Sequence, residues 1–260
     1  MNAGALESAT ESEDIVRLFR EAFVGRKISL AYQPQVCLGG GRTLRWEVLS
    51  RWHDEKLGHV SPTRFMEVVS HLGWGRRYTQ WLLKQALLDG RMLAAGHTGP
   101  FAFTFNLSPA ELANTPLVRD ICNFLESGLQ GDAEIGVEIT ERQGIDDSEN
   151  LIKNAQTLRS LGVKIGLDDF GAGYSRMQHL HELPLDFVKI DRSLITPLMC
   201  NQKSELVLDY IGRMAKDLGL FTVVEGVEEA EQAAWLMEHG FDAAQGYFFG
   251  HPAAADQIQF

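Results

Sequence analysis

Residues 147–169 read DSENLIKNAQTLRSLGVKIGLDD and place a helix, a glycine and a strand in direct succession. Apolar residues recur at helical spacing over 147–161, which predicts an amphipathic helix. Gly162 follows at the position where a left-handed residue commonly ends a helix. The apolar run over 164–169 then predicts a buried strand. A helix that leads through a glycine into a buried strand is typical of a sheet of parallel strands.

The same succession recurs at Gly219 and Gly240, and helical patterns also occupy 76–95 and 203–218. Strands are predicted near 29–36, 44–52, 101–107, 135–140, 164–169, 187–191, 221–226 and 243–249. Eight strands favour a closed α/β barrel of the (β/α)8, or TIM-like, type, which typically needs roughly 250 residues. An open doubly wound sheet is the alternative. A nucleotide-cofactor version of it is disfavoured, because neither of its glycine-rich phosphate-binding motifs occurs where it is needed.

Composition limits where the chain works and what it binds. Residues 1–12 are expected to form a flexible polar lead-in, and 13–260 a single domain. The net charge of -11 argues against binding to DNA or to an anionic membrane surface. No apolar stretch approaches the length of about 18 residues that a membrane span needs. Three scattered cysteines and no secretory signal favour the cytoplasm.

Acidic and amide residues stand on the predicted strands or directly after them. They are Glu47, Asn106, Glu138, Asp168, Asp169, Asp191, Glu225, Glu228 and Gln245, and Lys189 accompanies them. In a parallel barrel the carboxyl ends of the strands share one face, so we expect these side chains to converge there. A buried carboxylate is normally neutralised, paired or bound to a metal. Basic residues are too few to balance these acids, and oxygen ligands select hard ions such as Mg2+ or Mn2+.

Adjacent Asp168 and Asp169 could hold two metal ions, an arrangement that suits hydrolysis of a phosphodiester by metal-activated water. Lys189 could orient that water or neutralise charge that develops on the phosphate. The structural alternative for Lys189 is a salt bridge to Asp191 or Glu228.

Taken together, the motifs resemble the EAL-domain family of cyclic di-GMP phosphodiesterases over about residues 14–253. The matching segments begin with Tyr32-Gln33-Pro34, Glu47-Val48-Leu49-Ser50-Arg51-Trp52, Asn106-Leu107-Ser108 and Glu138-Ile139-Thr140-Glu141. They continue with Asp168-Asp169-Phe170-Gly171-Ala172-Gly173-Tyr174-Ser175, Lys189-Ile190-Asp191, Glu225-Gly226-Val227-Glu228 and Gln245-Gly246-Tyr247. Each triplet alone is a weak signal, whereas all of them in this order are highly specific.

The resemblance implies a barrel with one antiparallel strand and conversion of cyclic di-GMP to linear pGpG with two Mg2+ or Mn2+ ions. The implied metal ligands are Glu47, Asn106, Glu138, Asp168, Asp169 and Glu225. Catalytic roles fall to Lys189, which positions the water, and to Glu225, Glu228 and Asp191. Substrate contacts fall to Gln33, Arg51 and Gln245, and Glu141 resembles the residue that stabilises the loop after Asp169.

Two departures and one expectation of assembly accompany the resemblance. Val48 replaces the alanine of the family's name motif, but it should face the outer helices and matter little. His251 stands where the family usually has Arg or Lys, which puts one substrate contact in doubt. A homodimer is expected through the segment Tyr174–Leu183, although its apolar residues could simply pack on the barrel. A sensory or regulatory domain or protein is a further expected partner.

Two other functions stay open at this stage. One is a catalytically weak or inactive receptor that binds cyclic di-GMP and signals through a partner, because a fold alone does not prove activity. Such receptors typically lose metal ligands or the water-positioning lysine, and this chain keeps them all. The other is a metal-dependent hydrolase of a different phosphodiester.

Overall fold

A computed structural model describes residues 3–40, 43–94, 102–127, 133–140, 148–172 and 177–258. The strands are β1 (Ile28–Cys37), β2 (Thr43–Asp54), β3 (Gly58–Val60), β4 (Ala102–Leu107), β5 (Glu134–Thr140), β6 (Lys164–Phe170), β7 (Phe187–Ile190), β8 (Phe221–Glu225) and β9 (Ala243–Gln245). The helices are α1 (Ala3–Val24), α2 (Pro62–His71), α3 (Gly75–Ala94), α4 (Pro109–Ala113), α5 (Thr115–Glu126), α6 (Ser148–Ser160), α7 (Met177–Glu182), α8 (Arg192–Ile195), α9 (Gln202–Asp217), α10 (Ala230–Glu238) and the 3-10 turn η1 (Ala255–Gln257).

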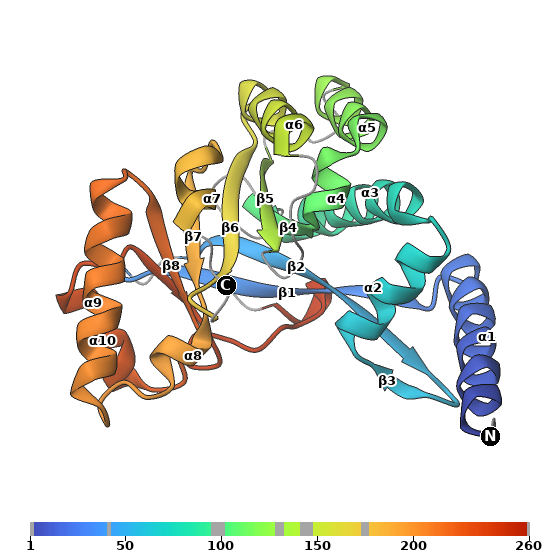
Figure 1. The fold of residues 1–260 in the computed structure, drawn as a ribbon, viewed down its shortest axis with the longest axis horizontal. Helices are drawn as coiled ribbons and strands as arrows, with labels where there is room; N and C mark the ends of the chain where they lie inside the picture. Colours follow the sequence, from blue (N-terminus) through green and yellow to red (C-terminus); the bar gives the residue numbers. More distant parts are fainter. Residues whose placement is uncertain are drawn as a thin grey trace.

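The strands close into a barrel with the order β1-β9-β8-β7-β6-β5-β4-β2, and pairing of β1 with β2 completes the circle (Figure 1). Strands β2 and β4–β9 pair in parallel, whereas β1 runs antiparallel to both β2 and β9. Only residues 38–42 separate β1 from β2, which is enough for a hairpin and too short for a parallel crossover. The predicted barrel and its single reversed strand are therefore confirmed.

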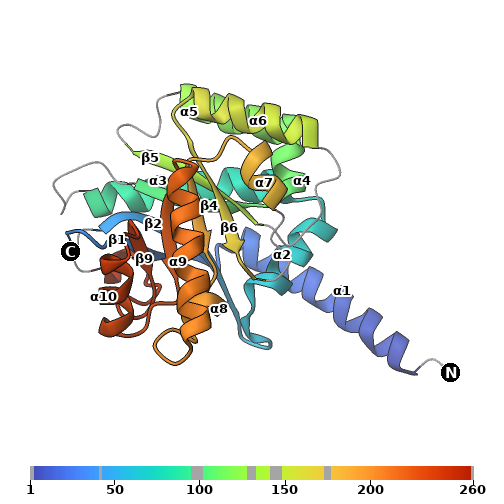
Figure 2. The ribbon, with the colours of Figure 1, turned by 60° about the vertical axis from the view of Figure 1, so that its left-hand side comes forward.

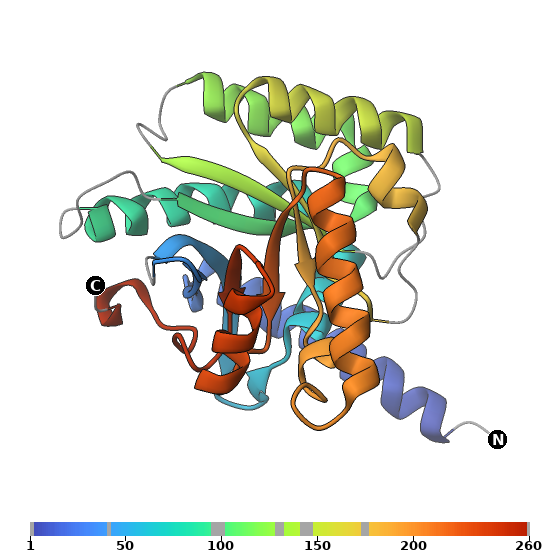
Figure 3. The ribbon, with the colours of Figure 1, turned by 90° about the vertical axis from the view of Figure 1, so that its left-hand side faces the viewer.

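Helices cover the outside of the barrel and bury its apolar face. Helices α5 and α6 lie side by side over one part of the wall, and α9 and α10 lie over another (Figures 1 and 3). Gly162, Gly219 and Gly240 have φ angles of 88°, 71° and 78°, so all three adopt the left-handed conformation expected at the helix ends. The helix–glycine–strand succession read from the sequence is what builds the parallel part of the wall.

The amino-terminal helix is longer than the sequence pattern indicated. Helix α1 begins at Ala3, so the backbone of most of the predicted lead-in is helical, and its flexibility stays a prediction. The first half of α1 projects beyond the barrel (Figure 2). Its second half packs on the domain, where the Phe19 ring lies 5.5 Å from the Trp52 ring. In the described part of the chain, no helix combines the length and apolar character that crossing a bilayer requires.

Two strand predictions differ from the structure. The short strand β3 extends the β2 hairpin and was not predicted. The last strand was expected over 243–249 but ends at Gln245. It ends there because Gly246 lies so close to the Val227 backbone that a side chain would overlap it. The chain turns at this point, and the backbone N–H of Phe248 then donates to the Val227 carbonyl.

The amino-terminal end of the parallel strands is closed by a packed layer, which we call the barrel floor: Arg45, Gly166, Phe187 and Phe221. The guanidinium of Arg45 lies 4.9 Å from the centre of the Phe187 ring and 5.9 Å from that of Phe221. Gly166 provides the space for the Phe187 ring, because a Cβ atom at this position would overlap it. The opposite end, formed by the carboxyl ends of the parallel strands, is the barrel mouth.

Candidate metal centre

Lys189 on β7 is the centre of a buried charge cluster and is itself only 1% exposed. Its Nζ lies 2.6 Å from Glu225 Oε1, 2.7 Å from Glu138 Oε2, 3.1 Å from Asp168 Oδ1 and 3.2 Å from Glu47 Oε2. The acids come from β2, β5, β6 and β8, so residues far apart in the sequence converge as the strand-end argument predicted. The partners of Lys189 are therefore these four acids, rather than the Asp191 or Glu228 of the structural alternative.

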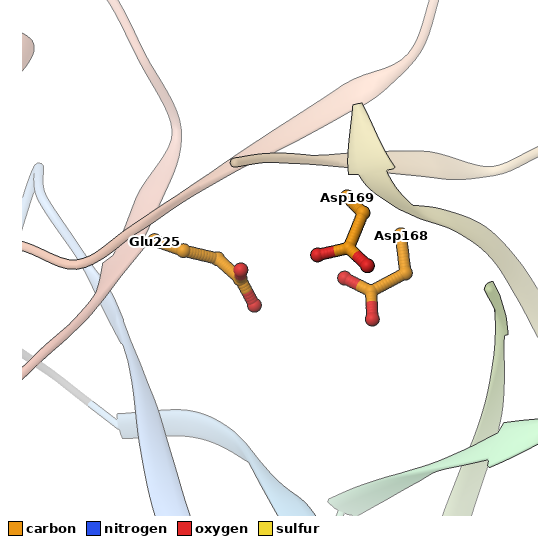
Figure 4. Close-up of side chains that lie close together, drawn as sticks. All are labelled: Asp168, Asp169 and Glu225. Atoms are coloured by element: carbon orange, nitrogen blue, oxygen red, sulfur yellow. The ribbon is translucent and has the colours of Figure 1, made fainter. Parts of the chain in front are cut away.

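Asp168, Asp169 and Glu225 form a group that could hold a metal ion. One carboxylate oxygen from each lies within 4.8 Å of the others, and all three side chains point into the same space (Figure 4). Asp169 has a φ angle of 56°, a left-handed conformation that is costly for a residue other than glycine. Such backbone strain is common at functional sites.

Unsatisfied oxygens at the cluster test whether a cation fits. Among the described residues, Asn106 Oδ1 is buried and has no hydrogen-bond partner, and Asp168 Oδ1 is buried with only the ion pair to Lys189 Nζ, 3.1 Å away. Buried polar atoms are normally paired, and carboxylate and amide oxygens are the ligands that Mg2+ and Mn2+ prefer. The donor set therefore fits a hard divalent cation.

The electrostatics of the cluster show a surplus of negative charge. Burial raises the pKa of Glu138 to about 7 and that of Glu225 to about 8, even though Lys189 acts in the opposite direction. Burial and neighbouring acids also raise the pKa of Asp168. The single ammonium group of Lys189 thus does not offset the burial of all the acids. A bound cation would add positive charge and lower their pKa values.

Glu47 is the exception among the buried acids. Burial opposes its ionisation, but Lys189 and hydrogen bonds from Gln245 and Asn106 outweigh burial and lower its pKa. Gln245 Nε2 donates to Glu47 Oε2 at 2.6 Å, and Asn106 Nδ2 donates to Glu47 Oε1 at 2.9 Å. Glu47 therefore stays anionic and is the best prepared of these acids to bind a cation.

The residues around Glu47 on β2 follow the expected alternation. Trp46 and Val48 are buried in the apolar cluster that includes the outer helices, while Glu47 points into the barrel. The valine at the family's alanine position is thus accommodated outside the site, as predicted.

The predicted substrate residues lie at two levels of the barrel. Gln33 and Gln245 are buried against the cluster, with Gln245 Nε2 also 3.0 Å from Gln33 Oε1. Arg51 is only half-buried, and burial lowers its pKa while Glu47 and Tyr247 oppose that shift. Gln33 and Gln245 thus help to hold the acids, and Arg51 is the more accessible group.

A stacked pair of aromatic rings near Arg51, which interacts electrostatically with Tyr247, was not predicted from the sequence. The rings of Tyr247 and His251 stack at a centroid distance of 4.1 Å, and Tyr247 is 57% exposed. An exposed aromatic residue two positions after a barrel strand was the signal that could have identified this pair. The histidine at the Arg or Lys position of the family is therefore part of an aromatic surface.

Two predicted residues, Asp191 and Glu228, have contacts away from the Lys189 cluster, and a third is not described. Asp191 caps α8, where its side chain accepts a hydrogen bond from the Ser193 backbone N–H at 2.9 Å. Glu228 is exposed, and its backbone N–H donates to Gln232 Oε1. Glu141 falls outside the described residues, so its stabilising role stays a prediction.

The fold and the site define a closed α/β barrel with a candidate divalent-metal centre at its mouth. Residues 17–252 match the EAL domain, and the chain belongs to the EAL domain family.

Named relatives and a solved structure agree with this assignment. The cyclic di-GMP phosphodiesterases NbdA and RocR of Pseudomonas aeruginosa are 33% and 34% identical over 95% and 85% of this chain. The chain spans only 32% of the length of NbdA and 56% of that of RocR. The structure of the PaMucR phosphodiesterase in complex with c-di-GMP has a TM-score of 0.83 and 29% identity, over 95% of this chain and 100% of that one.

Proposed function

We propose that the chain is a metal-dependent phosphodiesterase that hydrolyses cyclic di-GMP to linear pGpG. The observation that carries the proposal is the buried cluster of four acids around Lys189, with Asp169 beside it. Receptors that only bind a ligand have no need for a lysine and several acids concentrated at one buried point. The names of NbdA, RocR and PaMucR support the reaction and the substrate.

In the reaction, water oxygen forms a new bond to phosphorus, one phosphate ester bond breaks, and the departing sugar oxygen takes up a proton. The ligands would be Glu47, Asn106, Glu138, Asp168, Asp169 and Glu225. Two Mg2+ or Mn2+ ions bound there would supply Lewis acidity and a water of lowered pKa. Lys189 would hold the attacking water and neutralise negative charge that grows on the phosphate.

Arg51 and the aromatic surface would bind the substrate. A guanidinium group suits recognition of phosphate, and an exposed aromatic ring suits stacking against a guanine base. Gln33 and Gln245 supply buried amides between this level and the acids. Without cations the acids would repel the substrate phosphates, so we expect substrate binding to be stronger when metal is present.

Assembly and cellular context are part of the proposal. We propose a cytoplasmic homodimer that works with a sensory or regulatory domain or protein. Residues 173–176 of the expected dimer segment lie outside the described residues. Leu183 is buried in the main apolar core and Leu180 packs on the cluster around Phe170, so these two leucines serve the monomer. Contacts between subunits would then depend on other residues of the segment.

The test is incubation of the protein with cyclic di-GMP and either Mg2+ or Mn2+, followed by separation of the products. We expect linear pGpG with both ions and little with Ca2+, which tolerates looser geometry and holds water less well for attack. A receptor would bind cyclic di-GMP and return it intact. Equal rates with Ca2+ and Mg2+ would contradict the proposed two-metal geometry.

A further inference from the structure

Gln35 lies inside the barrel, beneath the acid cluster. It stands on β1 two residues after Gln33, so both side chains face the interior. Its side chain is 0% exposed, and its backbone pairs with Arg45 of the barrel floor. Because β1 runs against the other strands, the step from Gln33 to Gln35 leads away from the mouth. Gln35 is therefore placed to act on the cluster from below and not on an entering substrate.

The contact that Gln35 makes is with one particular oxygen. Its Nε2 donates to Glu138 Oε1 at 3.0 Å. The other oxygen of the same carboxylate, Oε2, accepts from Lys189 Nζ at 2.7 Å. Glu138 is 0% exposed, so these two donors decide how its carboxylate is rotated. The neutral donor holds the oxygen on the floor side, and the charged donor faces the other acids.

The Gln35 amide is oriented so that its N–H meets Glu138 while its own oxygen stays without a partner. Gln35 Oε1 is buried and has no hydrogen-bond partner among the described residues. Rotating the amide would direct this oxygen at Glu138 Oε1, so that two acceptors would face each other. The arrangement leaves one polar atom unsatisfied and keeps the N–H on the carboxylate. A buried amide that served structure alone would be expected to satisfy both of its ends.

We propose that Gln35 is a positioning residue that fixes Glu138 through Oε1, so that Oε2 faces Lys189 and the other acids, where a divalent cation would bind. A neutral donor suits this task, because it orients the carboxylate without adding positive charge that would compete with the cation. Removal of a group that hydrogen-bonds to a metal-binding carboxylate typically weakens metal affinity by roughly 10- to 100-fold. The inference rests on the proposed metal-dependent function.

The experiment measures Mn2+ binding by titration calorimetry without substrate. Gln35→Met and Gln35→Leu replace the amide by an apolar side chain of similar size and so remove the donor. Thr104→Val is the matched control, because Thr104 is equally buried, lies opposite Glu47 in the β2–β4 register and has a hydroxyl without a partner among the described residues. We expect both Gln35 variants to bind Mn2+ about 10- to 100-fold more weakly and Thr104→Val to bind like the wild type. Metal-free Gln35→Met should unfold at no lower temperature than the wild type.

Several results would overturn the inference. They are wild-type Mn2+ affinity in both Gln35 variants, equal weakening by Thr104→Val, no Mn2+ binding by the wild type, and failure of both Gln35 variants to fold. The last result would make Gln35 a structural residue. Hydrolysis of cyclic di-GMP by the wild type is assayed separately. If Mn2+ binds and depends on Gln35 while no pGpG forms, the proposed reaction fails and the role of Gln35 stands.

Discussion

The mouth and the floor of the barrel are built from the same strands but accommodate charged side chains in different ways. On β2, Glu47 joins a cluster of acids around Lys189, while Arg45, two residues earlier, lies against the aromatic rings of the floor. At the floor the half-buried guanidinium of Arg45 packs against aromatic rings. The mouth leaves acids with raised pKa values and oxygens without donors. On β2, a residue that packs the floor and a residue of the candidate metal centre are thus only two positions apart.

The largest effect is expected from Glu47→Ala, which removes the acid best prepared to bind a cation. We expect hydrolysis of cyclic di-GMP to be abolished while the circular dichroism spectrum of the folded protein is kept. Glu55→Ala is the control, because the Glu55 side chain is 90% exposed at the surface. Hydrolysis close to the wild-type rate in Glu47→Ala at saturating Mg2+ would show that the mouth is not the metal site.

Lys189→Ala should lower kcat by at least about a hundredfold, the scale of losing one positioned electrostatic or proton-transfer group. Substrate affinity should survive better than turnover, because Lys189 is buried below the accessible residues. Single-turnover kinetics and binding of cyclic di-GMP in Ca2+ measure the two quantities separately. A collapse of affinity with unchanged kcat would make Lys189 a substrate clamp.

The acids of the mouth should also make the metal-free protein pH-sensitive. Glu138 and Glu225 have pKa values raised to about 7 and about 8, above those of the unfolded chain. At pH values between the pKa of an unfolded-chain glutamate and these raised values, the folded protein binds more protons than the unfolded chain. The free energy of unfolding therefore falls as pH rises through this window. Unfolding temperatures in a chelator should decrease from about pH 5 to pH 9, and bound Mn2+ should reduce the decrease. A flat profile in the chelator would contradict the surplus of negative charge.

The smallest effect on turnover is expected at the floor. Gly166→Ala would force a methyl group against the Phe187 ring and should cost about 1–3 kcal/mol of unfolding free energy. Urea denaturation measures this loss, and kcat per folded molecule should stay near the wild-type value. Gly39→Ala is the matched control, because a Cβ atom there meets no atom within 4 Å. If Gly166→Ala lowered kcat as strongly as stability, the floor and mouth would not be independent.

Sequence patterns predicted the parts of the molecule that depend on periodicity and strong chemistry. The alternation of Trp46, Glu47 and Val48 settled which side chains enter the barrel, and buried acids on several strands predicted the cluster. The order of the motifs indicated the family resemblance, and that resemblance implied the reversed strand, which periodicity alone could not show. These signals lie in the order and spacing of residues along the chain, so one sequence suffices to find them.

Contacts between strands could not be read in the same way. Gln35 is a neutral residue on an apolar strand, and its importance depends on which atom of Glu138 it meets. Asp191 follows a strand like the clustered acids, yet its side chain turns back to cap α8. The stacking of Arg45 on Phe187 and Phe221 likewise depends on how three strands are placed side by side. Side-chain rotation and register decide these roles, and neither has a signature in spacing.

The reversal of β1 also decides where α1 is attached. Ile28, the first residue of β1, pairs with Trp52 at the mouth end of β2, whereas a parallel first strand would begin at the floor. Helix α1 therefore joins the domain at the mouth end of the barrel. Its Phe19 ring contacts Trp52, the neighbour of Arg51. A push or twist applied along the projecting half of α1 would pass through the Phe19–Trp52 contact to the residue next to Arg51, which we propose binds phosphate. The hairpin that completes the barrel thus also places the attachment point of α1 close to the proposed substrate contact.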